Sequence, residues 1–184
     1  MPENYAQWCG RSGRLYKSHP DNVPEFPWLG ALPIAFFEKL LKPEYRVLEH
    51  GCGGSTIWLA QRVKEVVSGA GDDPAWSEGT KKKLAELGLT NATVLDAWPV
   101  SPQAWGKFDI VFIDGGPTIF RNKTLRDAFV YYVKPGGWVI LDNYNHKVHD
   151  DAFAWAKSLS QTTITLKTPK TRFCHTAFMH VPNE

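Results

Sequence analysis

The stretch VLEHGCGGSTIWLA, residues 47–60, holds two apolar segments joined by a turn with glycine at positions 51, 53 and 54. Tyr45 to His50 has the pattern of a short buried strand, and Ser55 to Val63 has the spacing of a helix. Glycine lacks the Cβ atom that would keep a ligand off the backbone, and ligands of open α/β sheets bind beyond the strands' carboxyl ends. The glycine-rich turn, residues 51–54, is therefore a candidate ligand site. A tight turn that uses glycine for geometry alone would have the same pattern.

Outside this stretch, strand-like and helix-like segments alternate along the chain. Strands are predicted at residues 65–70, 92–97, 108–116 and 136–143, and helices at 27–41, 72–89, 124–133 and 151–159. Two further strand-like runs, 162–168 and 172–181, are joined by a connection too short for a crossover helix, so they should pair antiparallel. The sequence thus predicts an α/β fold: a doubly wound, mostly parallel seven-stranded sheet, helices on both faces and an antiparallel C-terminal strand pair.

The composition indicates one globular domain over residues 1–184, with an irregular arm at 1–26. The net charge of +2, from 21 basic and 19 acidic residues, gives little attraction to a polyanion, so nucleic acid is not the expected partner. Three widely spaced cysteines without a CxxC pair suggest neither disulfides nor zinc, and no apolar run suits a membrane or a signal peptide. We expect a cytoplasmic protein with a small-molecule partner, and the oligomeric state stays open.

Four segments, EHGCGGST, LDAWPV, FDIVFIDGG and KPGGWVILDN, follow one another in a familiar order and spacing. In this respect residues 27–181 resemble the Rossmann-like (class I) S-adenosylmethionine-dependent methyltransferases. The dinucleotide-binding pattern GxGxxG would need a glycine at position 56, where the chain has Thr56. The resemblance implies a methyltransferase that uses S-adenosylmethionine.

The resemblance assigns the methionine end of the cofactor to the glycine-rich turn and its neighbours. Glu49 would face the amino group, directly or through water, and Gly51 and Gly53 would let the methionine and ribose lie against the backbone. Ser55 and Thr56, at the predicted helix start, would offer hydroxyl and N–H donors to the carboxylate.

For the adenine end, the resemblance assigns Asp96 and the Ala97 backbone to the adenine amino group, although Asp96 could instead cap a turn. The family usually ends its second strand with an acid that holds the ribose hydroxyls, and this chain has SGAG there. Asp72 is the nearest acid, with a helix N-cap as its alternative role. Trp98 or Trp76 could flank the adenine, although a core role is the simpler interpretation for each.

Asp114, Asp142 and Asn143 resemble the magnesium ligands of the catechol-type O-methyltransferases. The lysine of those enzymes is replaced by Pro117, and an Asp-Asn pair also ends this strand in metal-free relatives. A general base is therefore expected elsewhere, with His146 as the first candidate and Asp114 as the second.

Basic residues follow the fourth predicted strand: Arg121, Lys123 and Arg126. They could bind an acidic substrate, but the solvated start of a helix is the simpler interpretation. The leading function is methyl transfer to a small molecule at oxygen. A nucleic-acid methyltransferase and a non-catalytic binding protein that kept the fold are the alternatives.

Overall fold

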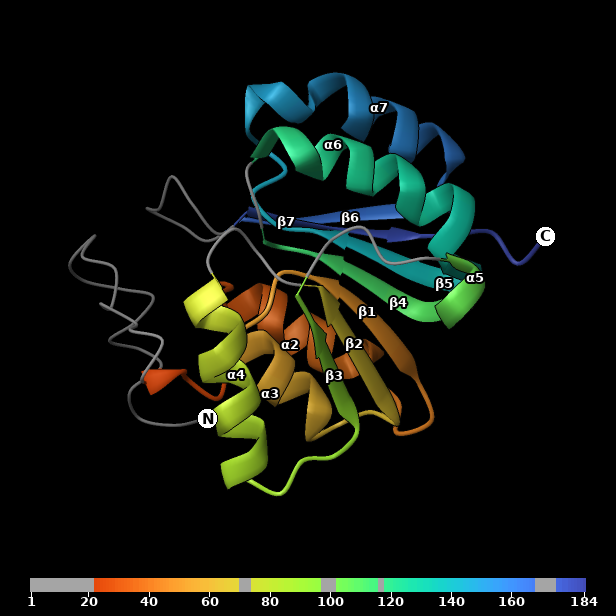
Figure 1. Ribbon diagram of the computed structural model, residues 1–184. Helices are drawn as coiled ribbons and strands as arrows, with labels where there is room; N and C mark the ends of the chain where they lie inside the picture. Colours follow the sequence, from red (N-terminus) through yellow and green to blue (C-terminus); the bar gives the residue numbers. More distant parts are fainter. Residues whose placement is uncertain (1–21, 70–73, 97–101, 116–117, 168–174) are drawn as a thin grey trace.

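A computed structural model of the chain describes residues 22–69, 74–96, 102–115, 118–167 and 175–184 (Figure 1). Two of the predicted site residues, Asp72 and Ala97, lie outside these ranges, as does most of the predicted N-terminal arm. Within the described part of the arm, Val23 is buried and belongs to the core.

A single sheet forms the centre of the molecule, with strand order β3-β2-β1-β4-β5-β7-β6. Its strands are β1 (Arg46–His50), β2 (Glu65–Gly69), β3 (Ala92–Leu95), β4 (Phe108–Ile113), β5 (Val133–Leu141), β6 (Thr162–Lys167) and β7 (His175–His180). The first five strands pair in parallel, whereas β7 runs antiparallel to both β5 and β6. The predicted fold class is confirmed.

Helices cover both faces of the sheet (Figure 1). One face carries α2 (Ala31–Leu40), α3 (Gly54–Ala60) and α4 (Pro74–Glu86); the other carries α6 (Thr118–Asp127), the π-helix η2 (Ala128–Tyr132) and α7 (Asp150–Leu159). Two short helices, α5 (Pro102–Trp105) and η3 (Lys147–His149), lie in connections. In the part of the chain that the structure describes, no helix is long and apolar enough to cross a membrane.

Successive side chains of the central strands enter two separate cores, because a strand points its residues alternately to opposite faces. In β1, Val47 packs with α2 and α3, while Leu48 packs with α6 and α7. Ile110 and Val111 of β4 divide in the same way. Strand segments covered on both faces need apolar residues at every position, which is why residues 110–113 of β4 form a continuous apolar run.

The helix boundaries differ from the sequence prediction around α6. The predicted helix was 124–133, but α6 begins at Thr118, becomes the π-helix η2 and ends before Val133, which pairs with Phe108 as the first residue of β5. The apolar residues at the start of α6, Ile119 and Phe120, are adjacent rather than three or four positions apart, so apolar spacing gave no signal for these turns. This earlier start places Arg121 over the carboxyl ends of β4 and β5 rather than in a loop.

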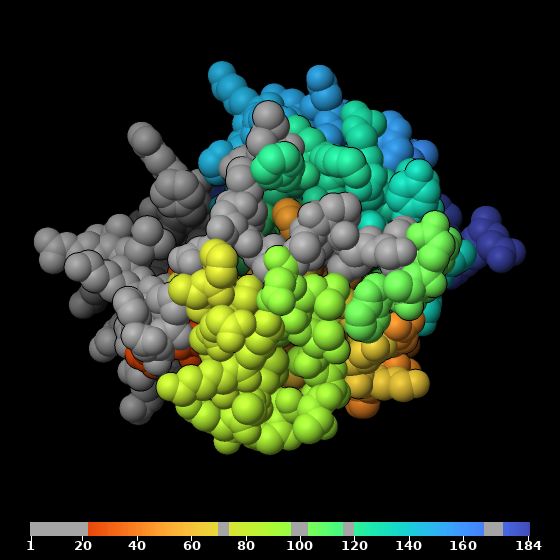
Figure 2. All heavy atoms as spheres, viewed as in Figure 1, coloured from red at the N-terminus to blue at the C-terminus, as the bar shows by residue number. Residues whose placement is uncertain are grey.

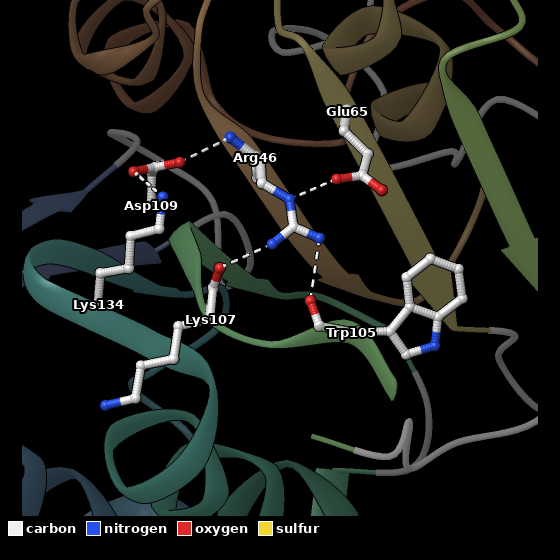
Figure 3. Close-up of polar contacts among 6 residues, drawn as sticks. All are labelled: Arg46, Glu65, Trp105, Lys107, Asp109 and Lys134. Carbon is white, nitrogen blue, oxygen red and sulfur yellow. Dashed lines mark hydrogen bonds and ion pairs between the residues drawn. The ribbon is translucent and has the colours of Figure 1, made fainter. Parts of the chain in front are cut away.

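At the amino ends of the strands, the Arg46 side chain joins several segments (Figure 3). Its guanidinium donates to the carbonyl oxygens of Trp105 and Lys107, each at 3.0 Å, and pairs with Glu65. The Arg46 backbone N–H donates to Asp109 at 2.8 Å, and Lys134 also pairs with Asp109 at 2.8 Å. These contacts tie β1, β2, β4 and β5 at the end of the sheet opposite the glycine-rich turn.

Candidate active site

Glu49, the second-last residue of β1, is completely buried and accepts hydrogen bonds from three hydroxyl groups. Ser55 donates to Oε1, and Thr56 and Ser68 lie 2.6 and 2.8 Å from Oε2. The Thr56 hydroxyl also accepts the Gly53 N–H at 3.0 Å. Glu49 therefore organises the glycine-rich turn from inside, and the hydroxyls of Ser55 and Thr56 point to it rather than outward to a ligand carboxylate as predicted.

Burial raises the pKa of Glu49 from 4.5 to about 7, although the hydroxyl donors oppose this shift. The hydrogen-bond pattern agrees with a protonated carboxyl. The Ser68 hydroxyl has one hydrogen but two acceptors, Glu49 Oε2 and the Gly51 carbonyl oxygen. When Glu49 carries a proton it can donate to Ser68, and the Ser68 hydrogen then satisfies Gly51.

The three glycines of the turn serve different purposes. A Cβ at Gly51, where φ is +114°, would lie 2.7 Å from the Gly115 Cα, and a Cβ at Gly54 would lie 2.9 Å from the Pro24 carbonyl oxygen. These two positions need glycine because other backbone packs there. At Gly53, with φ of +155°, the nearest atoms to a Cβ belong to Trp76, at 3.9 Å. Of the three, Gly53 alone would accommodate a Cβ without a clash, so packing against other backbone does not explain the glycine there.

Part of this region reaches the molecular surface. In Figure 2, orange atoms from the part of the chain that includes β1 and the glycine-rich turn are visible near the centre of the face, between the green atoms of α6 and the yellow-green atoms of α4 and β3. Trp76, at the start of α4, is half-buried and packs edge-to-face with Trp28 at 5.6 Å between ring centroids.

Asp114 and Asp142 meet at the carboxyl ends of the adjacent strands β4 and β5, as their positions in the sequence predict. Their carboxyl groups are hydrogen-bonded to each other. Burial and the neighbouring charge of Asp114 raise the pKa of Asp142 well above its usual range. Burial also raises the pKa of Asp114, against the effect of the Arg121 guanidinium and of the hydrogen bond from Asp142. Asp142 is therefore the member of the pair that holds its proton more tightly.

The donors around Asp142 do not suit the predicted magnesium site. Thr176 donates to its Oδ1 at 2.9 Å, and the Asn143 side-chain N–H donates to its Oδ2 at 2.6 Å. Magnesium requires oxygen ligands in octahedral geometry, but Asn143 directs its amide nitrogen to the carboxylate. Among the described residues, no group of three or more His, Cys, Asp or Glu side chains could hold a metal ion. The magnesium prediction is not supported.

Arg121 of α6 is half-buried at this end of the sheet, which corrects its interpretation as part of a solvated helix start. Its Nε donates to the Gly115 carbonyl oxygen at 3.1 Å, its Nη1 to the Asp142 carbonyl oxygen at 3.2 Å, and its Nη2 to the Asp114 carbonyl oxygen. Lys123 instead pairs with Asp127 on the helix surface.

The histidines near this end have different environments. His149 is fully buried with Nδ1 2.5 Å from the Asn122 side-chain oxygen, and burial and the Arg121 charge lower its pKa to about 4. Burial also lowers the pKa of His50 to about 4. His146, the predicted general base, is half-buried with its ring centroid 6.3 Å from that of His149. Among the described residues, no hydrogen bond joins His146 to the Asp114–Asp142 pair.

Comparisons with known proteins found solved structures but no sequence match: no protein-family model matches the chain, and no curated protein does. A methyltransferase from Pyrococcus furiosus superposes with a TM-score of 0.65 at 18% identity, covering 97% of this chain and 94% of that one. An rRNA methylase from Streptococcus thermophilus gives 0.64 at 16% identity, with 83% and 95% coverage. A SAM-dependent O-methyltransferase from Thermotoga maritima gives 0.64 at 13% identity, with 84% and 66% coverage.

The chain has the class I methyltransferase fold. Similarity at these identities establishes this fold, which the four sequence segments predicted, and leaves the acceptor open. Within the class I methyltransferase fold, the described end of β2 lacks the expected acid. Ser68 and Gly69 end the strand, and Glu65, its acidic residue, lies at the opposite end beside Arg46.

Asp96, the predicted adenine partner, is 79% exposed and pairs with Lys81 at 2.6 Å. Its carboxylate therefore lies at the molecular surface, next to Lys81. Sequence reasoning missed Ser68 and Thr176, which donate to the buried acids, and it misjudged Arg121. A polar residue that follows an apolar run at a strand's carboxyl end was the available signal for Ser68.

Proposed function

We propose that this protein is an S-adenosylmethionine-dependent methyltransferase that methylates a small-molecule acceptor at oxygen. The observation that carries the proposal is the placement of an acid pair, Asp114 and Asp142, next to the glycine-rich turn: Gly115, which follows Asp114, packs against Gly51. Methyl transfer needs a donor and a proton acceptor held close together, and this geometry provides for both. The cysteine pattern of the sequence makes the cytoplasm the proposed setting.

We place the cofactor at the turn around Gly53, where the nearest atoms to an added Cβ belong to the Trp76 ring, at 3.9 Å, rather than to backbone. When bound, S-adenosylmethionine supplies an activated methyl group. Glu49 holds the turn in shape through Ser55, Thr56 and Ser68, so its role is to position the backbone. Because Glu49 is completely buried, the proposal assigns it no direct contact with the ligand's amino group.

Asp114 is the proposed proton acceptor. Its pKa is raised by burial, which suits a base that works near neutral pH. Asp142 keeps its proton and donates to Asp114, which fixes the direction of the accepting oxygen. Asp114 would take the proton of the acceptor oxygen, and bound S-adenosylmethionine would supply the methyl group, with S-adenosylhomocysteine as the other product. This order reverses the sequence prediction, so His146, the first candidate there, becomes the second candidate for this task.

Calorimetry with S-adenosylmethionine and S-adenosylhomocysteine tests the first step. Binding with a 1:1 stoichiometry is expected, and Asp114→Asn should retain binding while losing methyl transfer to a panel of phenols, alcohols and RNA. RNA belongs in the panel because a neighbour of this fold is named an rRNA methylase. Methylation of RNA but of no small molecule would change the proposed acceptor from a small molecule to RNA. An absence of binding at millimolar cofactor would refute the proposal that the protein is an enzyme.

The second candidate is a binding protein without catalysis. It is favoured by the lack of an acid among the described residues at the carboxyl end of β2, which are Ser68 and Gly69. Without an acid there, two hydroxyls of a ribose lose their usual bidentate partner, which weakens cofactor binding. This candidate predicts no turnover with any acceptor and no tight cofactor binding. Turnover with any acceptor would exclude this candidate, and a Gly69→Glu variant tests the position of the ribose, since it should strengthen cofactor binding only if the ribose lies at the end of β2.

A further inference from the structure

The carboxyl ends of β4 and β5 carry a positive charge that is fixed in place by the backbone. The Arg121 guanidinium donates to three carbonyl oxygens, those of Asp114, Gly115 and Asp142, and each of its nitrogens is used once. The planar fork of arginine matches such a set, whereas a lysine ammonium could not span it. The charge therefore sits beside the acid pair whether or not a ligand is bound.

The helix that carries Arg121 is held in place by hydrogen bonds of the next residue, Asn122. Asn122 donates to the Val148 carbonyl oxygen at 2.6 Å, and its side-chain oxygen lies 2.5 Å from His149 Nδ1. These bonds join α6 to η3. They hold the backbone of α6 at the residue next to Arg121, so the stem of the arginine starts from a fixed position.

The same guanidinium occupies the electrostatic position that a divalent cation would need. Such an ion would have to lie between the Asp114 and Asp142 oxygens, next to an existing positive charge, and the repulsion between them is large where water is scarce. It would also have to displace the Thr176 and Asn143 donors from Asp142. The carbonyl oxygens that could complete an oxygen shell are already bound to Arg121.

We propose that Arg121 is the resident cation of this site, so that the acceptor presents a single hydroxyl to Asp114 rather than a vicinal diol to a metal ion. The acceptor class rests on the proposed function; the exclusion of a divalent ion by Arg121 does not. The class is an isolated alcohol or phenol, because chelation of two neighbouring hydroxyls requires a metal with open positions.

Titration with Mn²⁺, followed by the electron paramagnetic resonance of the free ion, tests the exclusion without any activity. The wild-type protein, alone and with S-adenosylhomocysteine, should bind no Mn²⁺ at this site below about 1 mM. In Arg121→Ala the freed carbonyl oxygens and the two aspartates form an oxygen-rich site, so Mn²⁺ affinity should rise at least tenfold. Arg121→Met, which keeps the apolar stem, serves if the alanine variant does not fold.

Lys123→Ala is the matched control, because it removes an exposed cation from the same helix without touching the strand ends. It should bind Mn²⁺ no better than the wild type. A wild-type site with a Kd below 1 mM that Asp142→Asn abolishes would overturn the proposal. So would a folded Arg121 variant that gains no affinity. Failure of cofactor binding by calorimetry would remove the proposed function and leave this result intact.

Discussion

Glu49→Gln tests whether the buried acid beneath the glycine-rich turn is neutral at physiological pH. Glutamine keeps the size of the side chain and its hydrogen-bonding carbonyl, but it cannot ionise. If Glu49 is protonated in the folded protein up to about pH 7, the wild type must release this proton from a buried position as the pH rises. The variant has no such proton to lose.

The magnitude follows from the difference between the folded and unfolded states. The folded-state pKa is raised from 4.5 to about 7, so the folded protein binds the proton more tightly. The stabilisation is complete below pH 4.5 and is lost as the pH rises through 7. At about 1.36 kcal/mol per pH unit, the full loss is about 3.4 kcal/mol, of which about 2.5 kcal/mol falls between pH 5 and pH 8.

Urea unfolding at a series of pH values measures this loss. The free energy of unfolding of Glu49→Gln, minus that of the wild type, should rise by about 2.5 kcal/mol from pH 5 to pH 8. Taking the difference between the free energies of unfolding of the two proteins removes the contributions of His50, Asp114 and Asp142, which titrate in both. Glu86→Gln, at an exposed position on α4, is the control and should show a constant difference. A constant difference for Glu49→Gln as well would refute a neutral buried acid.

Three further predictions concern the ends of the sheet and are measured by urea unfolding. Gly115→Ala should lower the free energy of unfolding by about 3 kcal/mol, because its Cβ would meet the Gly51 backbone. The control Gly88→Ala, at a position with φ of +66° and open space, should lower it by about 1 kcal/mol, and equal losses for the two variants would contradict the close contact. Arg46→Ala should cost about 2 kcal/mol in the same assay by leaving two carbonyl oxygens without their charged donor, and a loss no larger than that of Lys134→Ala would count against this assignment. Gly53→Ala should lose about 1–3 kcal/mol of stability to backbone strain and should bind S-adenosylhomocysteine more weakly in calorimetry below its unfolding temperature; unchanged affinity would remove the turn from the cofactor site.

The fold was predictable because the apolar pattern of the strands and the lengths of their connections determine how the strands pair. Continuous apolar runs such as that of β4 require cover on both faces, and the short connection between β6 and β7 permits only antiparallel pairing. The start of α6 was not predictable from spacing. Its first turns lack helically spaced apolar residues, and Arg121 and Asn122 in them bind the backbone of other segments, which local sequence does not reveal.

The candidate site was predictable where strand ends decide it and unpredictable where side-chain direction decides it. Asp114 and Asp142 follow neighbouring strands, so topology alone brings them together. The directions of the Ser55 and Thr56 hydroxyls depend on the charge state and burial of Glu49, and the resemblance placed them on a ligand instead. The roles of Asp72 and Ala97 remain predictions, because both lie outside the described residues.

The contact between Gly51 and Gly115 has a consequence for how this sequence can diverge. Each backbone fills the space where the other's Cβ would stand, so a side chain at either position must move the strand end at the other. A side chain at both positions would place two Cβ atoms in the same contact, so a second substitution does not relieve the first. Relatives that keep this path of the chain should therefore keep glycine at both positions, and a relative with a non-glycine residue at one of them should differ in the path of the chain at the other.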